Sequence, residues 1–164
     1  MPLHFQSKIV DPQQLKNWRE SLRREGRRLV ATNGCFDLLH VGHVTYLEQA
    51  RNQGDCLVVG INGDQSVRTL KGEGRPINGQ ENRALVLAAL ESVNAVFIFQ
   101  EVRAVDFLQQ VQPDVYVKGG DYTLETLNQE ERKAVEQGGG RIVIIPFVPG
   151  HSTTGLAEKI KRIG

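Results

Sequence analysis

The chain has 164 residues, of which 40% are hydrophobic and 24% charged, and its formal net charge is +1. This composition is typical of a globular protein with a sizeable core, and the near-neutral charge argues against a broad nucleic-acid or membrane surface. We therefore expect a single domain over residues 1–164, in which residues 1–26 form a helical N-terminal extension that packs on the core.

The two cysteines also limit the class of protein. Cys35 and Cys56 do not form a C-x-x-C pair, and they are too few for a disulfide framework or a four-ligand zinc site. The N-terminus lacks the basic start and apolar run of a signal peptide, and no apolar stretch approaches the ~20 residues that span a bilayer. We expect a cytoplasmic protein with reduced thiols.

In chain order, the first half predicts two helices and two strands. Asp11-Pro12 favours a helix start because Asp is a good N-cap and Pro suits the first helical turn. The predicted elements are a helix ending at Gly26, a strand over residues 29–32, a turn at Asn33-Gly34, a helix that opens within residues 35–43 and stops near Gly54, and a strand over residues 56–61. Residues 62–80 follow as a long polar loop, and long loops in compact domains are often functional.

The second half continues the alternation of helices and strands. It predicts a helix over residues 81–91, a strand over 95–99, a helix over 104–111, a strand over 115–117, a helix near 129–137, a strand over 141–146 and a last helix from Ser152, with Leu156, Ile160 and Ile163 on its apolar face. This alternation predicts an α/β fold, a Rossmann-like doubly wound parallel five-stranded sheet between two helical layers. Ligands of such sheets bind beyond the carboxyl ends of the strands.

The motif with the strongest chemical signal is TNGCFDLLHVGH, residues 32–43, which follows the first strand and opens a helix. His40 and His43 are expected to project together from the first helical turn, where free N–H groups and the helix dipole favour anions. Gly42 leaves room for a nucleotide to approach. Two plain surface histidines are the alternative, whereas zinc binding by the pair is disfavoured because no third ligand lies nearby.

The second polar cluster lies after the second strand. Asp64 can bind a substrate hydroxyl or a water on magnesium, and Lys71 and Arg75 suit closure over a polyphosphate. A solvated charged loop is the alternative. Arg83 lies in the first turn of a helix, where a cation is unfavourable, so we expect it to have a partner, either a ligand or an acidic side chain such as Glu81.

Two further clusters follow the fourth and fifth strands. Lys118 and Asp121 flank a glycine pair, Gly119-Gly120, which permits a ligand to approach the backbone. Ser152, Thr153 and Thr154 begin the last helix, where capping requires only one hydroxyl, so phosphate binding is expected of the others. A plain turn and simple capping are the respective alternatives.

Absent motifs exclude other enzyme classes. The sequence has no G-x-G-x-x-G after a strand, no G-x-x-x-x-G-K-[ST] and no G-x-S-x-G. These absences argue against a dinucleotide-dependent oxidoreductase, a P-loop kinase and a serine hydrolase.

Residues 32–43 and the Ser152-Thr153-Thr154 element together resemble the cytidylyltransferase-like nucleotidyltransferases. The match is to their G-x-F-D-x-x-H-x-G-H motif, and it involves Gly34, Phe36, Asp37, His40, Gly42 and His43. The segments GINGDQSVRTLKGEGRPI, ENRALVLAAL, PDVYVKGGDY and PFVPGHSTTGL narrow the resemblance to the adenylyltransferases of D-glycero-β-D-manno-heptose 1-phosphate, in a form without a preceding kinase domain.

The resemblance implies an enzyme that uses ATP and a sugar 1-phosphate, releases pyrophosphate and makes ADP-heptose for the lipopolysaccharide core or surface-layer glycans. It implies a Mg²⁺ cofactor that arrives with the ATP phosphates and no metal ligand from the protein. It also implies a homodimer, with neither a nucleic acid nor a membrane as partner. One departure is that no arginine lies in residues 147–150, where some CTP-using relatives have one, and His151 can supply a donor instead.

The implied roles divide the candidate residues into three groups. His40, His43 and Lys71 act in catalysis. The nucleotide and its phosphates contact Asn33, Gly34, Cys35, Phe36, Gly42, Arg83, Ser152, Thr153 and Thr154. The sugar phosphate side is assigned to Asp37, which also orients its loop, and to Asp64, Lys118, Gly119, Gly120 and Asp121, of which Asp64 and residues 118–121 can instead hold the base.

Three other functions stay open. The first is the same chemistry with CTP and a polyol phosphate, and the second is a nucleotide-binding regulatory module without turnover. The third, a fragment of a tRNA-charging enzyme, is disfavoured because the chain is short and has no basic stripe.

Overall fold

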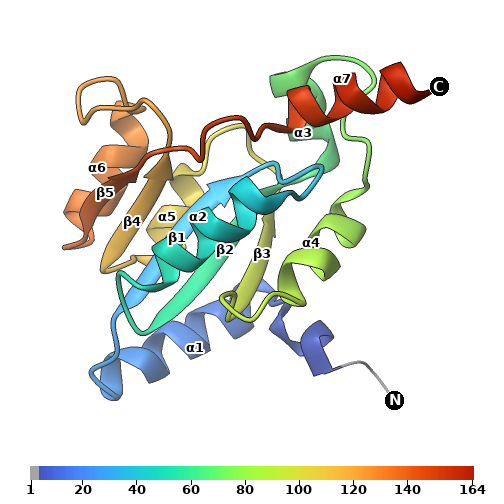
Figure 1. The fold of residues 1–164 in the computed structure, drawn as a ribbon. Coiled ribbons are helices and arrows are strands. Elements are labelled where there is room, and N and C mark those ends of the chain that lie inside the picture. Colours follow the sequence, from blue (N-terminus) through green and yellow to red (C-terminus); the bar gives the residue numbers. More distant parts are fainter. Residues whose placement is uncertain (1–3) are drawn as a thin grey trace.

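A five-stranded parallel sheet forms the centre of the computed structural model, which describes residues 4–164 (Figure 1). The strand order is β3-β2-β1-β4-β5, with every pair parallel. The strands are β1 Leu29–Gly34, β2 Cys56–Asn62, β3 Ala95–Phe99, β4 Val115–Gly119 and β5 Arg141–Ile145. The strand order reverses at β1, and this confirms the predicted doubly wound sheet with its switch point between β1 and β4.

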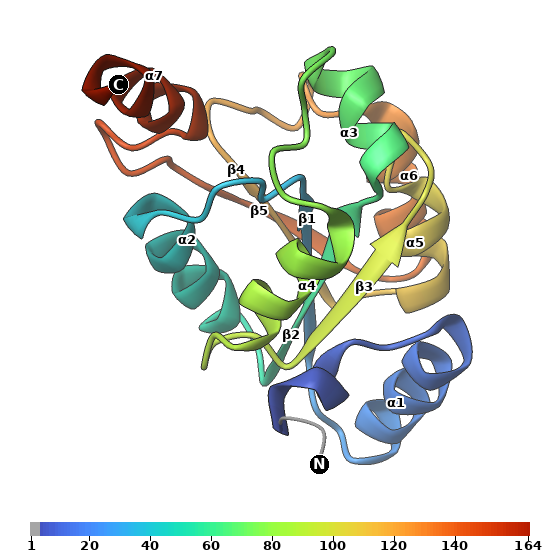
Figure 2. The same cartoon turned by 90° about the vertical axis from the view of Figure 1, so that its right-hand side faces the viewer.

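Helices cover both faces of the sheet (Figure 2). The helices of the described residues are η1 His4–Lys8, α1 Pro12–Arg24, α2 Val41–Arg51, α3 Asp64–Lys71, α4 Gln80–Ala88, α5 Val105–Val111, α6 Gln129–Gln137 and α7 Thr153–Ile163. Helices α1, α5 and α6 share one hydrophobic core with the sheet, whereas α2 and α4 share the other. No helix among the described residues is long and apolar enough to cross a membrane.

The alternation of side chains along the strands divides them between the two cores. All seven residues of β2 are buried. Val58 packs on the α1–α5–α6 face, and its neighbours Leu57 and Val59 pack on the α2–α4 face. Successive strand residues point to opposite faces, so a strand covered on both sides has to be apolar throughout.

Helix α1 begins where the sequence predicts. The Asp11 carboxylate accepts the backbone N–H of Gln14, and the Gln14 side chain accepts the N–H of Asp11, which completes a capping box around Pro12. Leu15 and Leu22 are fully buried against the sheet. The N-terminal helix is therefore part of the α1–α5–α6 face.

Two local expectations are wrong. The predicted polar loop of residues 62–80 contains helix α3, which buries Val67. The predicted turn at Asn33-Gly34 is instead the end of β1, paired with Gly60 and Ile61 of β2. The last helix is present as predicted, as α7, but its apolar face has no buried residue, and Ile163 is 87% exposed. In each case a long-range contact, or its absence, decides a structure that local sequence leaves open.

Candidate active site

The imidazoles of His40 and His43 lie at the start of α2, beyond the carboxyl end of β1. Their ring centroids are 3.9 Å apart and the planes differ by 25°. His40 is the N-cap, with φ −144° and ψ 175°, so it precedes the helix instead of lying in its first turn as we expected. Its Nδ1 accepts the Gly42 N–H at 3.1 Å, and this bond orients the ring.

Both imidazoles hold a buried nitrogen without a hydrogen-bond partner among the described residues. These atoms are Nε2 of His40 and Nδ1 of His43. Because Nδ1 of His40 accepts a hydrogen bond, its neutral ring carries the proton on Nε2 and has a donor available. Buried polar atoms without partners are uncommon and point to a ligand or an ordered water.

The surroundings disfavour the charged form of both rings in the free protein. Burial lowers the pKa of His43 to about 4, helped by the charge of His40 and opposed by a hydrogen bond to the Leu38 backbone. Burial, followed by the charge of His151, also lowers the pKa of His40. An anion at this position has the opposite effect, since it favours the protonated imidazole.

The loop between β1 and α2 is held in place by a buried aromatic ring. Phe36 has φ 47° and is 7% exposed, and its ring centroid lies 5.2 Å from that of His43. A Cβ on Gly34 would lie 2.9 Å from the Phe36 ring, so glycine is required for this ring to pack under the histidines. The remaining candidate of this loop, Cys35, is partly buried and accepts a hydrogen bond through its carbonyl.

Asp37 connects this loop to the segment between α3 and α4. Its carboxylate, 1% exposed, accepts Nε of Arg75 at 2.8 Å and the backbone N–H groups of Ile77 and Asn78. The Asn78 side chain in turn donates to the Asp37 carbonyl. The carboxylate thus orients the loop through contacts within the chain.

Arg83 has a comparable internal position. Its guanidinium is buried and donates to the carbonyls of Asn78 and Cys35 and to Oδ1 of Asp64 at 2.8 Å. The acidic partner expected from the sequence is therefore Asp64 and not Glu81. Arg83 joins three segments of the site, and Asp64, with 39% of its side chain exposed, is the member of the pair that reaches the surface.

Lys71 is the last residue of α3 and is exposed, with no hydrogen bond or ion pair to any described residue. Burial raises the pKa of the Cys35 thiol, and the positive charge of Lys71 partly opposes this rise. Gly72 and Gly74 follow with φ +93° and +84°, in the region that favours glycine. Lys71 is thus a free cation close to the first loop, next to a segment with backbone freedom.

A buried polar network lies at the ends of β1 and β4. The Tyr116 hydroxyl donates to Oδ1 of Asn33, and it also lies 3.3 Å from Oε2 of Glu131. Lys118 Nζ lies 3.4 Å from Asn33 Oδ1 and 3.7 Å from Glu131 Oε2. The other oxygen of Glu131 accepts the Ala104 N–H. Burial lowers the pKa of Lys118, whereas the charge of Glu131 raises it.

Tyr116 and Glu131 are site residues that the sequence did not predict. Tyr116 reads as one of the apolar residues of a strand, and Glu131 reads as a solvent-facing residue of a charged helix. The one sequence signal at Glu131 is that it lies in the first turn of α6. An acidic residue there is also expected because it interacts favourably with the helix dipole.

The glycine pair after β4 is covered by an aromatic ring. A Cβ on Gly120, which has φ +109°, would lie 2.4 Å from the Phe147 ring, and one on Gly119 would lie 3.2 Å from it. The close approach that these glycines permit is therefore to Phe147. Asp121, which follows, is exposed.

Helix α7 begins against the first loop. Ser152 is its N-cap, and Oγ accepts the Gly155 N–H at 3.0 Å. The Thr153 hydroxyl donates to the Leu38 carbonyl at 3.4 Å, whereas Thr154 is exposed. Ser152 thus has the capping role, and Thr153 brings the N-terminus of α7 to the loop that precedes α2.

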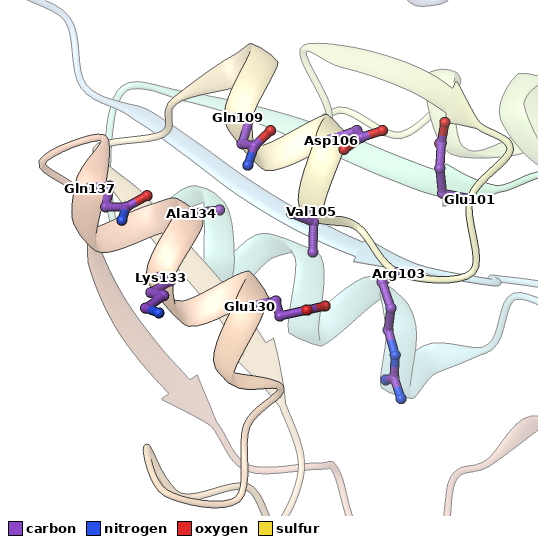
Figure 3. Close-up of a pocket in the computed structure, with 9 residues that line it drawn as sticks. All are labelled: Glu101, Arg103, Val105, Asp106, Gln109, Glu130, Lys133, Ala134 and Gln137. Atoms are coloured by element: carbon purple, nitrogen blue, oxygen red, sulfur yellow. The ribbon is translucent and has the colours of Figure 1, made fainter.

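One hollow of the surface lies away from these residues. It is a groove of about 520 Å³ between α5 and α6, and its charged side chains include both signs (Figure 3). Such a mixed surface does not favour a polyphosphate. The candidate site is the open region where the N-termini of α2 and α7 and the ends of β1, β2 and β4 meet.

This site has the features of a nucleotidyltransferase. A doubly wound sheet places two helix N-termini and a pair of imidazoles at its carboxyl edge, and Lys71 lies nearby as a cation without an ion pair to the described residues. Such a combination suits a polyphosphate. The chain belongs to the family described as cytidylyltransferase-like, which matches residues 31–156.

Curated relatives agree with this family. The chain is 52% identical over 140 residues to the bifunctional protein HldE of Geobacter sulfurreducens, a match that covers 85% of this chain and 28% of the relative. HldE of Koribacter versatilis is 51% identical over 154 residues, covering 94% of this chain and 31% of the relative. The chain therefore spans about a third of the length of these relatives.

Solved structures share the fold. A lipopolysaccharide core biosynthesis protein from Thermoplasma volcanium has a TM-score of 0.62 at 26% identity, covering 75% of this chain and 98% of that one. A pantoate-beta-alanine ligase from Francisella tularensis has a TM-score of 0.55 at 14% identity, covering 94% and 77%, which supports the fold alone.

Proposed function

We propose that the chain transfers the adenylyl group of ATP to a sugar 1-phosphate, D-glycero-β-D-manno-heptose 1-phosphate, and releases ADP-heptose and pyrophosphate. The observation that carries the proposal is the stacked pair His40 and His43, with two buried nitrogens that lack a partner. The similarity to HldE proteins and to a lipopolysaccharide core biosynthesis protein supports the choice of sugar.

The reaction is a single displacement at the α-phosphorus of ATP. An oxygen of the sugar phosphate forms the new bond, and the bond to the oxygen that bridges the α- and β-phosphates breaks. No covalent enzyme intermediate is involved, so positioning and charge stabilisation supply the catalysis. The Nε2–H of His40 and the imidazole of His43 stabilise the charge that develops on the α-phosphate and the bridging oxygen.

The triphosphate is held by groups from three segments. Lys71 is a free cation next to glycines that permit the segment to close over the phosphates. Free N–H groups at the start of α7, with the exposed hydroxyl of Thr154, bind the pyrophosphate portion. Backbone groups of residues 33–36 face the nucleotide.

The sugar phosphate is placed on the side of Lys118. Lys118 is the cation of the network with Asn33, Tyr116 and Glu131, and Asp121 is an exposed carboxylate beyond the glycine pair. Lys118 donates to phosphate or hydroxyl oxygens, and Asp121 accepts from sugar hydroxyls.

Mg²⁺ fits this site as a companion of the nucleotide. The carboxylates of Asp37 and Asp64 already bind Arg75 and Arg83. The described residues contain no group of three side chains suited to a metal ion. Phosphate oxygens and water would hold the ion, and the exposed carboxylate of Asp64 could bind one of its waters. When bound, it neutralises charge on the phosphates.

The test is a panel of ATP, CTP, GTP and UTP with several sugar 1-phosphates and glycerol 3-phosphate, followed by pyrophosphate release. ATP with heptose 1-phosphate is expected to give the highest kcat/KM. Preference for CTP with a polyol phosphate would replace the proposal by the cytidylyltransferase alternative. Tight ATP binding without turnover on any acceptor would identify a regulatory nucleotide-binding module instead.

A homodimer in the cytoplasm completes the proposal. Ile160 and Ile163 of α7 are 55% and 87% exposed, and a helix with an unburied apolar face is suited to a second copy. Light scattering after gel filtration is expected to give twice the mass of the chain at micromolar concentration, whereas a monomer would remove this part of the proposal.

A further inference from the structure

His151 is a third imidazole at the site, and it comes from a segment more than a hundred residues after the other two. Its ring centroid lies 6.5 Å from that of His40, with 24° between the planes. A Cβ on Gly42 would lie 3.1 Å from the Cβ of His151, so the chain before α7 packs directly on the start of α2. Its position over the histidine pair is therefore set by the packing of the backbone.

The electrostatics also place His151 at the pair. Its positive charge is one cause of the lowered pKa of His40, so the two rings repel each other when protonated. His151 has no hydrogen bond or ion pair to any described residue and is exposed. Between residues 142 and 158 it is the one side chain of the sequence that can become a cation. An anion between the rings would remove the repulsion.

In the proposed reaction, the acceptor and the leaving pyrophosphate lie on different sides of the sheet. Tyr116 belongs to the α1–α5–α6 core. Lys118 lies on the same face of the sheet because it is two residues further along β4. Asn33 lies there too, since it contacts both side chains. His40 and His151 instead belong to the N-termini of α2 and α7. In a single displacement the entering and leaving oxygens lie on opposite sides of the phosphorus. The leaving group therefore lies away from Lys118, on the side of His151.

We propose that His151 binds the β- and γ-phosphates of the triphosphate, and hence the leaving pyrophosphate, together with the N-terminus of α7. The inference rests on the proposed nucleotidyl transfer and assigns its leaving-group side. Loss of one hydrogen bond to a charged phosphate is expected to weaken binding about tenfold, which is about 1.4 kcal/mol.

The test is calorimetric binding of inorganic pyrophosphate, ATP and AMP, with Mg²⁺, to the wild type, His151→Ala and His4→Ala. His4 is an exposed histidine of η1 and serves as the control, because the N-terminal segment lies at the opposite end of the molecule from α7 (Figure 1). We expect His151→Ala to weaken pyrophosphate and ATP about tenfold and to leave AMP within twofold. His4→Ala is expected to bind all three as the wild type does, and His151→Arg to restore pyrophosphate affinity.

Two results would overturn the inference. One is unchanged pyrophosphate and ATP affinity in a folded His151→Ala variant, and the other is an equal loss for AMP, which would assign His151 to the α-phosphate or the nucleoside. No acceptor sugar enters these titrations. A wild type that binds ATP but uses no sugar phosphate would therefore refute the proposed reaction without deciding the role of His151.

Discussion

The carboxylate of Asp37 accepts Nε of Arg75 at 2.8 Å, across 38 positions of the sequence. It also accepts two backbone N–H groups, from Ile77 and Asn78. One buried side chain thus holds together the loop before α2 and the segment that carries Arg75. The imidazole pair and the segment after Lys71 depend on this connection for their relative position.

Asp37→Asn is expected to lower the free energy of unfolding by about 3 kcal/mol. This value is at the lower end of the range for breaking a buried ion pair, because Arg75 is partly exposed. An amide offers one acceptor oxygen and turns an NH₂ group toward backbone donors. Urea unfolding at neutral pH measures the loss. Asp106→Asn, at an exposed carboxylate of α5, is the control, and equal stability of the two variants would contradict the role of Asp37.

His43→Ala is expected to lower kcat roughly 10²–10³-fold, as for the loss of one donor to a developing oxyanion. The KM for ATP should change much less, because the interaction strengthens in the transition state. Initial rates of pyrophosphate release measure both constants, with His4→Ala as the control. A variant with near-wild-type kcat would remove His43 from the chemistry.

The pKa of His43, about 4 in the free protein, predicts a pH effect on stability. The unfolded chain takes up a proton near the ordinary histidine pKa of about 6.5, before the folded chain does. Between these values the unfolded state binds more protons, so stability is full above pH ~6.5 and falls as the pH drops toward 4. Urea unfolding from pH 7.5 to 4.5 should show a shallower decline for His43→Gln than for the wild type.

Nucleotide binding should reverse this shift. The negative charge of the phosphates favours imidazolium, so the pKa of His43 is expected to rise when ATP binds. Carbon-detected NMR titration of the histidine rings, with and without Mg²⁺-ATP, measures the change. An unchanged His43 pKa in the saturated complex would contradict phosphate contact at this ring.

Glu131→Gln tests the network at the end of β4. The amide keeps the shape that binds Ala104 and Tyr116, but it removes the charge that raises the pKa of Lys118. We expect the KM for the sugar phosphate to rise roughly tenfold, about 1.4 kcal/mol, while the KM for ATP stays within twofold.

Glu130→Gln is the matched control for this variant. Glu130 precedes Glu131 in α6, but it lines the groove between α5 and α6 instead of the network (Figure 3). Equal effects of the two substitutions, or an equal rise in both KM values, would contradict an acceptor-side role of Glu131.

The sequence predicted the strands well because each contains a run of apolar residues, as a parallel strand buried on both faces requires. Helix starts marked by a capping residue, such as Asp11 and Ser152, were also predicted correctly. The motif at residues 32–43 was sufficient to predict the imidazole pair, since its residues are close in sequence.

Contacts between distant residues could not be predicted in the same way. Arg83 and Asp64 are 19 positions apart, and the choice of Asp64 over Glu81 depends on how α3 and α4 pack. Tyr116 and Glu131 look like an apolar strand residue and a solvated helix residue until the fold joins them. The covering of Gly120 by Phe147 likewise depends on the path of the chain after β5.

Adenylyl transfer is tested most directly by tracing the labelled phosphates of ATP in the presence of heptose 1-phosphate. With ATP labelled at the α-phosphate, the label is expected in the sugar nucleotide, and with ATP labelled at the γ-phosphate, in pyrophosphate. Transfer of the γ-label to the sugar, or no transfer of the α-label to any sugar phosphate, would contradict adenylyl transfer at this site.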